Sequence, residues 1–300
     1  MDAALVKSAI LIFLILLGYL LKRAGLFKKE DSKILSNIML YVTLPAVLVN
    51  AFRDFTIDAR LLSFALIGLA ADAILVTVGW RVGRKEAPGV RAMYMICMSG
   101  YNIGSFAIPF VQNLFPGQMM EAIMFDMGNS IMNCGIIFSL AAMQVHPDAK
   151  FSLKALGKTL FSTFPFDLYV GLLLLSLFHF RFPAPIYQLA DTVAGANAVV
   201  VMLMLGIMFE VKLAPDARHQ VLGIVTGRVA TTAAMALALF FLLPFPVEQR
   251  VIAVLLVCAP ISGMATVFCG KLGCDPSVYG TATSLTIPVS IAVMLGISLI

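Results

Sequence analysis

Charged residues are scarce in this sequence. Only 12% of the 300 residues are Asp, Glu, Lys or Arg, whereas 61% are hydrophobic and the mean hydropathy is +0.98. A soluble domain carries about 25% charged residues, so this composition excludes an ordinary soluble protein. Apolar stretches of about 20 residues recur along the whole chain, and each could cross a hydrocarbon layer of about 30 Å as a helix. The sequence therefore predicts an all-α membrane protein.

Residues that usually carry catalysis or bind metals are also few. The five cysteines have no CxxC spacing and lie in or beside apolar segments, so we expect neither a disulfide nor a metal site. The three histidines fall at loops or span ends, and the chain has no HExxH, GxSxG or P-loop motif. We therefore expect no cofactor. The net charge of +5 comes from short loops rather than a basic folded domain, which argues against nucleic acid.

Hydropathy predicts ten transmembrane spans, with boundaries uncertain by a few residues. They lie near residues 4–21, 34–52, 61–80, 92–115, 122–144, 159–180, 188–209, 220–243, 250–270 and 277–300. The first apolar stretch is followed by Lys22 and Arg23 instead of a small-residue cleavage site. We therefore expect it to remain in the protein as the first span.

The basic residues predict the orientation. Ten spans place both termini on one side of the membrane. Sixteen of the 21 Lys and Arg residues then fall on one face, and the other five fall on the face that holds the termini. Because cytoplasmic loops are enriched in Lys and Arg, both termini are predicted to be periplasmic in the cytoplasmic membrane of a bacterium.

The longest polar connection, 146–158, divides the chain into residues 1–145 and 146–300, with five predicted spans in each. Phe151, Leu153 and Leu156 alternate with lysines there, a pattern typical of an interfacial amphipathic helix. Since five is odd, the second half begins on the opposite side from the first. A structural repeat would therefore be inverted.

Two predicted spans are interrupted by Gly, Pro and small polar residues. They are the fourth and the ninth, and each is the penultimate span of its half. Corresponding broken helices in two halves indicate a binding site near the middle of the membrane. An ordinary proline kink with small packing residues is the alternative. The candidate binding residues are Asn102, Gly104, Ser105 and Pro109 in the first break and Pro260, Ser262, Gly263 and Thr266 in the second.

Two half-helix N-termini that meet would favour an anionic ligand, because they offer free N–H groups and partial positive charge. No basic residue lies at the centre of a predicted span. Arg228 is only about eight residues into its span, and we expect it to extend to the cytoplasmic surface. The sequence therefore favours a small carboxylate held by helix ends and the Asn102 amide over one held by an arginine.

Acidic residues inside spans are functional candidates because each is costly in the membrane. Asp72 lies in the middle of the third span, and Asp126 begins the fifth. Each could exchange a proton or merely pair with a neighbouring amide. Asn129 and Asn133 continue a polar stripe along the fifth span. These four residues are the candidates for coupling to H⁺ or Na⁺.

Several short motifs resemble the auxin efflux carrier family of permeases, which includes bacterial malonate and malate transporters and plant PIN auxin exporters. The resemblance covers essentially the whole chain. Its motifs are Leu35-Ser36-Asn37 to Leu44-Pro45-Ala46, Asn102 with Gly104 and Pro109, Phe125-Asp126-Met127-Gly128-Asn129, and Pro260 with Asp275-Pro276.

The resemblance implies ten helices in two inverted five-helix repeats, with the fourth and ninth helices crossing at prolines. It implies an architecture related to bile acid sodium symporters, with a scaffold part and a mobile part that moves like an elevator. The family's carboxylate-binding asparagine corresponds to Asn102. Where plant members have an amide after the second proline, this chain has Ile261, Ser262 and Gly263, and no counterpart of Pro45 occurs around 197–200. These departures bear on substrate identity.

The expected function is secondary transport of a small organic anion, such as a mono- or dicarboxylate, with the lipid bilayer as the surroundings. The oligomeric state stays open, with a homodimer as one option. An intramembrane enzyme, a passive channel and a membrane sensor are the alternatives.

Overall fold

The computed structural model describes residues 3–53, 55, 58–146, 148–210 and 217–298, and these residues form helices and connecting segments with a single isolated β-bridge. In the first half the α-helices are α1 (Ala3–Arg23), α2 (Ser32–Ile38), α3 (Leu44–Ala51), α4 (Ala59–Val82), α5 (Pro88–Met98), α6 (Ile108–Leu114), α7 (Met119–Ile131) and α8 (Ile137–Val145). The second half contains α9 (Leu153–Leu160), α10 (Phe164–Leu177), α11 (Ala184–Gly195), α12 (Asn197–Met208), α13 (Arg218–Leu242), α14 (Val247–Val257), α15 (Gly263–Lys271) and α16 (Pro276–Ser298).

Short turns of other helix types extend several of these elements. Three are five-residue π-helical turns: η2 (Met39–Thr43), η4 (Ile103–Ala107) and η6 (Met132–Ile136). Three are 3₁₀ turns: η1 (Lys29–Asp31), η3 (Gly83–Lys85) and η5 (Pro116–Gln118). π-Helical turns inside α-helices are frequent at functional sites.

Seven helical stretches in the described residues are long and apolar enough to cross a membrane unbroken. They are Leu5–Arg23, Lys29–Ala51, Ala59–Lys85, Pro116–Val145, Ala184–Met208, Arg218–Leu242 and Pro276–Ile297. An eighth is a bent pair, α9 and α10, whose axes differ by 84°. Two predicted spans, 92–115 and 250–270, are instead each divided into two short helices. The chain is thus an all-helical membrane protein with seven or eight such stretches.

The predicted amphipathic helix between the halves corresponds to α9. It begins at Leu153, which is 75% exposed, and Ser152 caps its N-terminus by accepting a hydrogen bond from the Ala155 N–H at 3.3 Å. Leu156 points the other way and packs beside Gly135 of η6. Phe151 precedes the helix. A short helix with one packed and one exposed face fits the predicted interfacial position.

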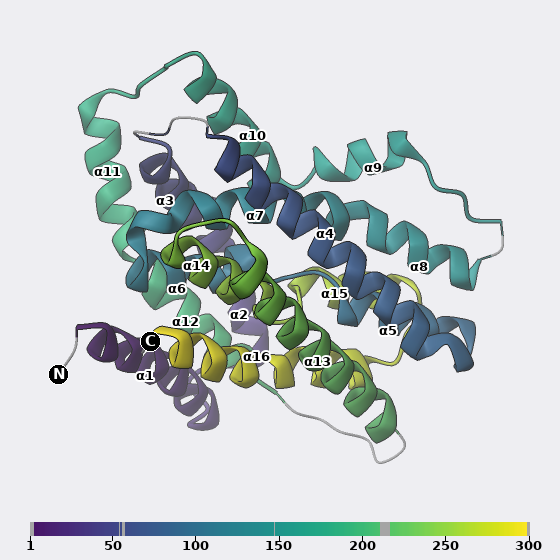
Figure 1. Cartoon of the computed structure of the whole chain (residues 1–300). Coiled ribbons are helices and arrows are strands. Elements are labelled where there is room, and N and C mark those ends of the chain that lie inside the picture. Colours follow the sequence, from purple (N-terminus) through teal and green to yellow (C-terminus); the bar gives the residue numbers. More distant parts are fainter. Residues whose placement is uncertain (1–2, 54, 56–57, 147, 211–216, 299–300) are drawn as a thin grey trace.

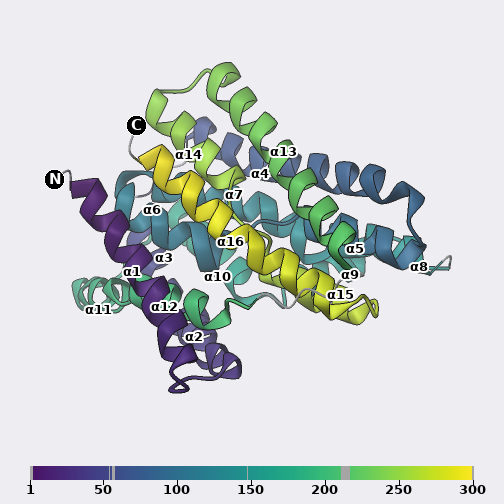
Figure 2. The ribbon, with the colours of Figure 1, turned by 90° about the horizontal axis from the view of Figure 1, so that it is seen from below.

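The helices form two packed groups (Figures 1 and 2). In one group α1 packs on α12, α2 on α12, and α3 on α11. In the other, α4 packs on α5, α7 and α13, α8 packs on α5, and α13 and α15 pack on α16. We call these the α1–α12 group and the α4–α13 group. Two helices contact both groups. α6 contacts α1 and α12 of the first group and α7 of the second, and α10 contacts α3 of the first and α7 of the second.

Glycines allow the closest helix contacts within each group. A Cβ on Gly128 of α7 would lie 1.8 Å from the carbonyl oxygen of Ala65 in α4. Likewise a Cβ on Gly206 of α12 would lie 2.0 Å from the carbonyl oxygen of Ile15 in α1. Small residues let membrane helices approach until their backbones touch, so each group is packed without room for a side chain at these points.

A chain of hydrogen bonds connects α6 with the α1–α12 group. Thr43 Oγ1 donates to Asn197 Oδ1 at 2.8 Å, and Asn197 Nδ2 donates to Gln112 Oε1 of α6 at 3.1 Å. Gln112 Nε2 then donates to the Ala194 carbonyl at 3.0 Å. Asn197 is fully buried, so these polar groups satisfy one another away from water. We call this contact between α6 and the α1–α12 group the seam.

Candidate functional site

The two predicted broken helices meet in space. α5 ends at Met98 and η4 begins at Ile103, while α14 ends at Val257 and α15 begins at Gly263. Between these ends, Tyr101 and Ile261 form the isolated antiparallel β-bridge. The Asn102 N–H donates to the Pro260 carbonyl at 3.0 Å, and the Ser262 N–H donates to the Gly100 carbonyl at 3.3 Å. We call residues 99–102 the first break and residues 258–262 the second break.

The prolines do not occupy equivalent places, which corrects the expectation that the helices cross at prolines. Pro260 lies within the second break. Pro109, however, is buried inside the continuous helical stretch Ile103–Leu114, just after the π-helical turn η4, and so lies outside the first break. Gly100 instead turns the chain in the first break, with a φ of 70° that favours glycine.

Side chains from α4 and α7 satisfy the backbone of the first break. Asp72 Oδ1 accepts from the Gly100 N–H at 2.8 Å. Asn129 binds Tyr101 twice, because Oδ1 accepts from its N–H at 2.9 Å and Nδ2 donates to its carbonyl at 3.1 Å. Asp72 and Asn129 are both buried. They supply the partners that a neighbouring strand would supply in a sheet.

A second amide, that of Asn133, binds the second break. Asn133 Nδ2 donates to Ser262 Oγ at 2.8 Å, and the same oxygen caps α15 by accepting from the Met264 N–H at 3.2 Å. Thr286 Oγ1 of α16 accepts from the Ile261 N–H at 3.2 Å. The fifth predicted span therefore contributes an amide that binds the second break.

Asp126 lies deeper than predicted. Because α7 begins at Met119, this carboxylate is two turns inside the helix and is buried, not at the start of the span. Oδ1 accepts from Asn129 Nδ2 at 2.8 Å, and Oδ2 accepts from the Tyr169 hydroxyl of α10 at 2.7 Å. A Cβ on Gly104 would lie 3.7 Å from Oδ2. Asp126 thus connects Asn129 of the site with α10 and lies beside the start of η4.

Arg228 does not extend to the surface as predicted. It is only 2% exposed, and its guanidinium donates to the Met98 carbonyl at 2.6 Å and to the Ala259 carbonyl at 3.0 Å. Its Cζ atom lies 4.9 Å from the centroid of the Tyr101 ring. The physical reason is that the ends of α5 and α14 leave carbonyls without intrahelical partners, and these attract a buried cation.

The start of η4 is the open part of the site. Asn102 is half-buried, and its side-chain amide makes no hydrogen bond with any residue in the described part of the chain. The following residues, Gly104 and Ser105, are also half-buried, and as first-turn residues their N–H groups have no intrahelical acceptor. By contrast, Ser262 already caps α15. Gly263 is exposed, and Thr266 donates to its carbonyl at 2.8 Å.

Sequence reasoning missed three contributors to the site. Tyr169, Tyr101 and Thr286 are buried and contact Asp126, Arg228 and the second break, respectively. Tyr or Thr inside an apolar span is common, so only the structure distinguishes these residues from packing. The hydroxyls of Tyr169 and Thr286 have hydrogen-bond partners at the site, whereas Tyr101 contributes its ring and its backbone and its buried hydroxyl has no hydrogen-bond partner among the described residues.

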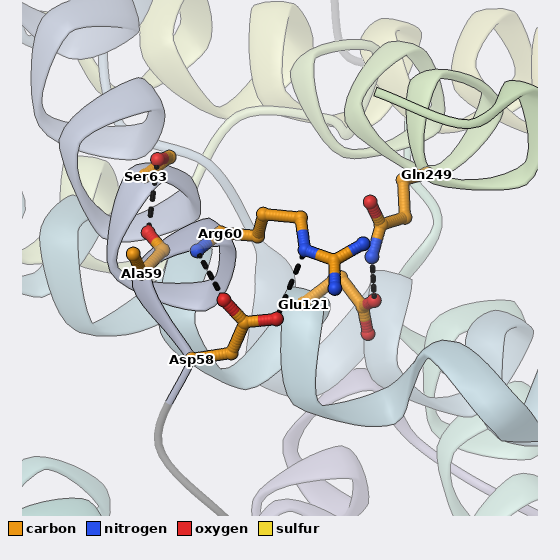
Figure 3. Close-up of polar contacts among 6 residues, drawn as sticks. All are labelled: Asp58, Ala59, Arg60, Ser63, Glu121 and Gln249. Atoms are coloured by element: carbon orange, nitrogen blue, oxygen red, sulfur yellow. Dashed lines mark hydrogen bonds and ion pairs between the residues drawn. The ribbon is translucent and has the colours of Figure 1, made fainter. Parts of the chain in front are cut away.

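A polar cavity of about 420 Å³ opens where α3 ends and α4, α7 and α14 begin. In Figure 3, Asp58 and Arg60 are paired, and Glu121 accepts from Gln249 Nε2 at 3.1 Å. Asp58 accepts from the Arg60 N–H at 3.0 Å and from its Nε at 2.9 Å. The backbone N–H of Arg60, together with its guanidinium, lowers the pKa of Asp58. A neighbouring cavity, lined by Asn50 and Gln112, continues this opening toward the seam.

Comparison with known proteins identifies the family of this chain. The family described as Membrane transport protein matches residues 3–154. An uncharacterized transporter of Methanocaldococcus jannaschii is 23% identical over 219 residues, which cover 68% of this chain and 68% of the relative. The family match spans half of the chain, from α1 through both residues that hold the first break. The chain therefore belongs to this membrane transport family, that of the auxin efflux carriers.

Proposed function

We propose that this chain is a secondary active transporter that moves a small organic anion, a mono- or dicarboxylate, across the cytoplasmic membrane of a bacterium. The observation that supports this most is the antiparallel crossing of the two breaks, beside an open helix N-terminus. Broken helices that meet at one point are typical of binding sites in secondary transporters.

The open N-terminus of η4 supports an anionic substrate. The amide of Asn102 can donate to one carboxylate oxygen, and the N–H groups of Gly104 and Ser105 can donate to the same carboxylate. The half-helix adds partial positive charge. Asp126, which lies beside Gly104, already accepts from Tyr169 and Asn129, so each of its oxygens has a protein donor. These groups form the substrate site in our proposal. The second break holds the backbone of Asn102, because the Pro260 carbonyl accepts from its N–H.

The proposed architecture has ten spans in two inverted repeats, with both termini periplasmic. The seven continuous stretches, α10 and the two broken pairs would make up these ten. The proposed motion is elevator-like: the α4–α13 group carries the crossing, while the α1–α12 group stays in place. In support, the crossing and all four predicted coupling residues lie in the α4–α13 group. Either a monomer or a homodimer is compatible with this motion.

Counterflow in proteoliposomes tests the proposal. Vesicles loaded with unlabelled malonate or malate are expected to accumulate the labelled anion transiently, with saturation and without ATP. Flux that rises linearly with concentration would identify a passive channel instead. Chemical conversion of the anion would identify an enzyme, and the same samples analysed by mass spectrometry would detect it.

Asp72 is the proposed coupling residue for protons. Oδ1 accepts from Gly100, whereas the buried Oδ2 has no hydrogen-bond partner among the described residues and can receive a proton. The charged groups that act on it are Arg228 and Asp126. Asp72→Asn is expected to keep exchange of labelled for unlabelled anion but to remove its stimulation by an inward proton gradient. If the variant retains the wild-type pH dependence while an imposed Na⁺ gradient drives uptake, Na⁺ is the coupling ion.

A further inference from the structure

The buried guanidinium of Arg228 holds the end of α5, which leads into the first break, and the second break at once. Its Nη1 atom holds the carbonyl of Met98, the last residue of α5, and its Nη2 atom holds the carbonyl of Ala259 in the second break. These two acceptors come from opposite halves of the chain. Among the described residues, no other charged side chain donates to both of these segments.

The location of Arg228 explains why a charge is tolerated there. Helices α5 and α14 both end at the crossing, so the negative ends of two helix dipoles converge on this point. Asp72 lies close enough to Arg228 for a Coulombic interaction. A guanidinium therefore meets two helix C-termini and a carboxylate in a region where an unpaired charge would be costly.

The shape of the guanidinium also fits. It is planar and presents its donors in a fixed fork, so it can bind two carbonyls and still stack on a ring. Here it lies over Tyr101, the residue whose backbone forms the β-bridge with Ile261. Arg228 thus stacks on a residue of the β-bridge and also donates to one carbonyl at the end of α5 and to one just after α14.

We infer that Arg228 is a positioning residue that fixes the crossing of the two breaks and thereby orients Asn102 toward the substrate. This inference rests on the proposed function for its link to substrate. Asn102 is connected to Arg228 through the crossing itself, because its N–H donates to Pro260, the residue after Ala259. Arg228 has no role as a direct substrate ligand in this scheme.

A native thiol reports on the crossing without any reference to transport. Cys97 is fully buried and precedes Met98, and its sulfur lies 3.7 Å from that of Cys269 in α15. Cys134, which is also buried, belongs to a separate cluster with Leu160 and Phe166. Alkylation of Cys97 by N-ethylmaleimide therefore measures opening at the crossing, and alkylation of Cys134 measures general loss of packing.

The experiment compares the full-length wild type with Arg228→Gln and Arg228→Lys. Arg218→Gln is the control, since Arg218 begins the same helix but is exposed. In Arg228→Gln, N-ethylmaleimide is expected to alkylate Cys97 at least about 10-fold faster than in the wild type, because local opening becomes more populated. The rate for Cys134 should be unchanged. Arg228→Lys keeps the charge but loses the fork, so it should fall between the wild type and Arg228→Gln. The control should match the wild type.

Ligand binding is measured on the same proteins by thermal shift with malonate and malate. The dissociation constant is expected to rise about 10- to 100-fold in Arg228→Gln and less in Arg228→Lys. Unchanged Cys97 alkylation in Arg228→Gln overturns the inference, and so does equal exposure of Cys97 and Cys134. If the wild type binds no carboxylate at all, the proposed function fails, while the alkylation result still decides whether Arg228 positions the crossing.

Discussion

Asn102→Ala is expected to reduce saturable anion uptake to the background level while the protein remains folded. The Asn102 side chain is half-buried and is not needed by any hydrogen bond within the described residues, so its removal leaves no protein group unpaired. What it removes is a donor to a charged ligand. A hydrogen bond to a charged group contributes about 1.5–3 kcal/mol, which is about a 10- to 100-fold change in affinity.

Uptake of labelled malonate or malate into proteoliposomes measures this effect. The control is Asn113→Ala in α6, which removes an amide of the same type that only donates to the Pro109 carbonyl at 2.8 Å. Asn113→Ala should transport like the wild type. Size-exclusion profiles should be the same for all three proteins. Wild-type uptake by Asn102→Ala would remove this residue from the substrate site.

Asn129→Ala should instead destabilise the protein. The alanine leaves the N–H and the carbonyl of Tyr101 without their partners and deprives Asp126 of a donor, all in a buried position. Each buried polar group that loses its partner costs about 1–3 kcal/mol, so the three groups together cost about 3–9 kcal/mol. This is a large fraction of the stability of a typical domain.

The midpoint temperature of unfolding in detergent, followed by fluorescence-detected size exclusion, measures this loss. Ser130→Ala is the matched control, because Ser130 is the next residue in α7 and is only half-buried. A midpoint for Asn129→Ala equal to that of Ser130→Ala would show that water or another group replaces the amide. The first break would then be held by Asp72 alone.

These two asparagines illustrate which parts of the site a sequence can predict. The breaks were predictable because Gly, Pro and small polar residues interrupt spans that are otherwise apolar. The four coupling candidates were predictable because acids and amides are costly in a membrane, and all four lie in the hydrogen-bonded network around the breaks. The function assigned to each of them stays a prediction. Sequence could suggest that these residues have partners but could not identify them.

Arg228 shows where that reasoning ends. Its distance from the end of its span suggested that it could reach the surface, and hydropathy holds no information on what lies beside it. Its acceptors lie 130 and 31 residues before and after it in the chain, respectively. Pro109 failed for a related reason. A proline marks a place where an N–H is absent, but the helix Ile103–Leu114 continues through Pro109, and the chain breaks earlier, at Gly100.

The second break was harder still. The sequence lacks an amide directly after Pro260, and the amide that binds the second break comes from Asn133, 129 residues away from Ser262. No local pattern could have indicated this exchange between spans. The Thr43, Asn197 and Gln112 chain at the seam is similar, since three unremarkable polar residues become informative only when they meet.

The crossing also has a consequence for biosynthesis. Gly100, Tyr101 and their partners Asp72 and Asn129 all belong to the half of the chain that leaves the ribosome first. The Met98 carbonyl accepts from Arg228, a residue that is translated 130 residues later. The first half must therefore enter the bilayer with this helix end unneutralised, held by the insertion machinery or by trapped water. Assembly of the crossing therefore cannot finish before the second half is translated, and a truncated first half should be a substrate for membrane quality control.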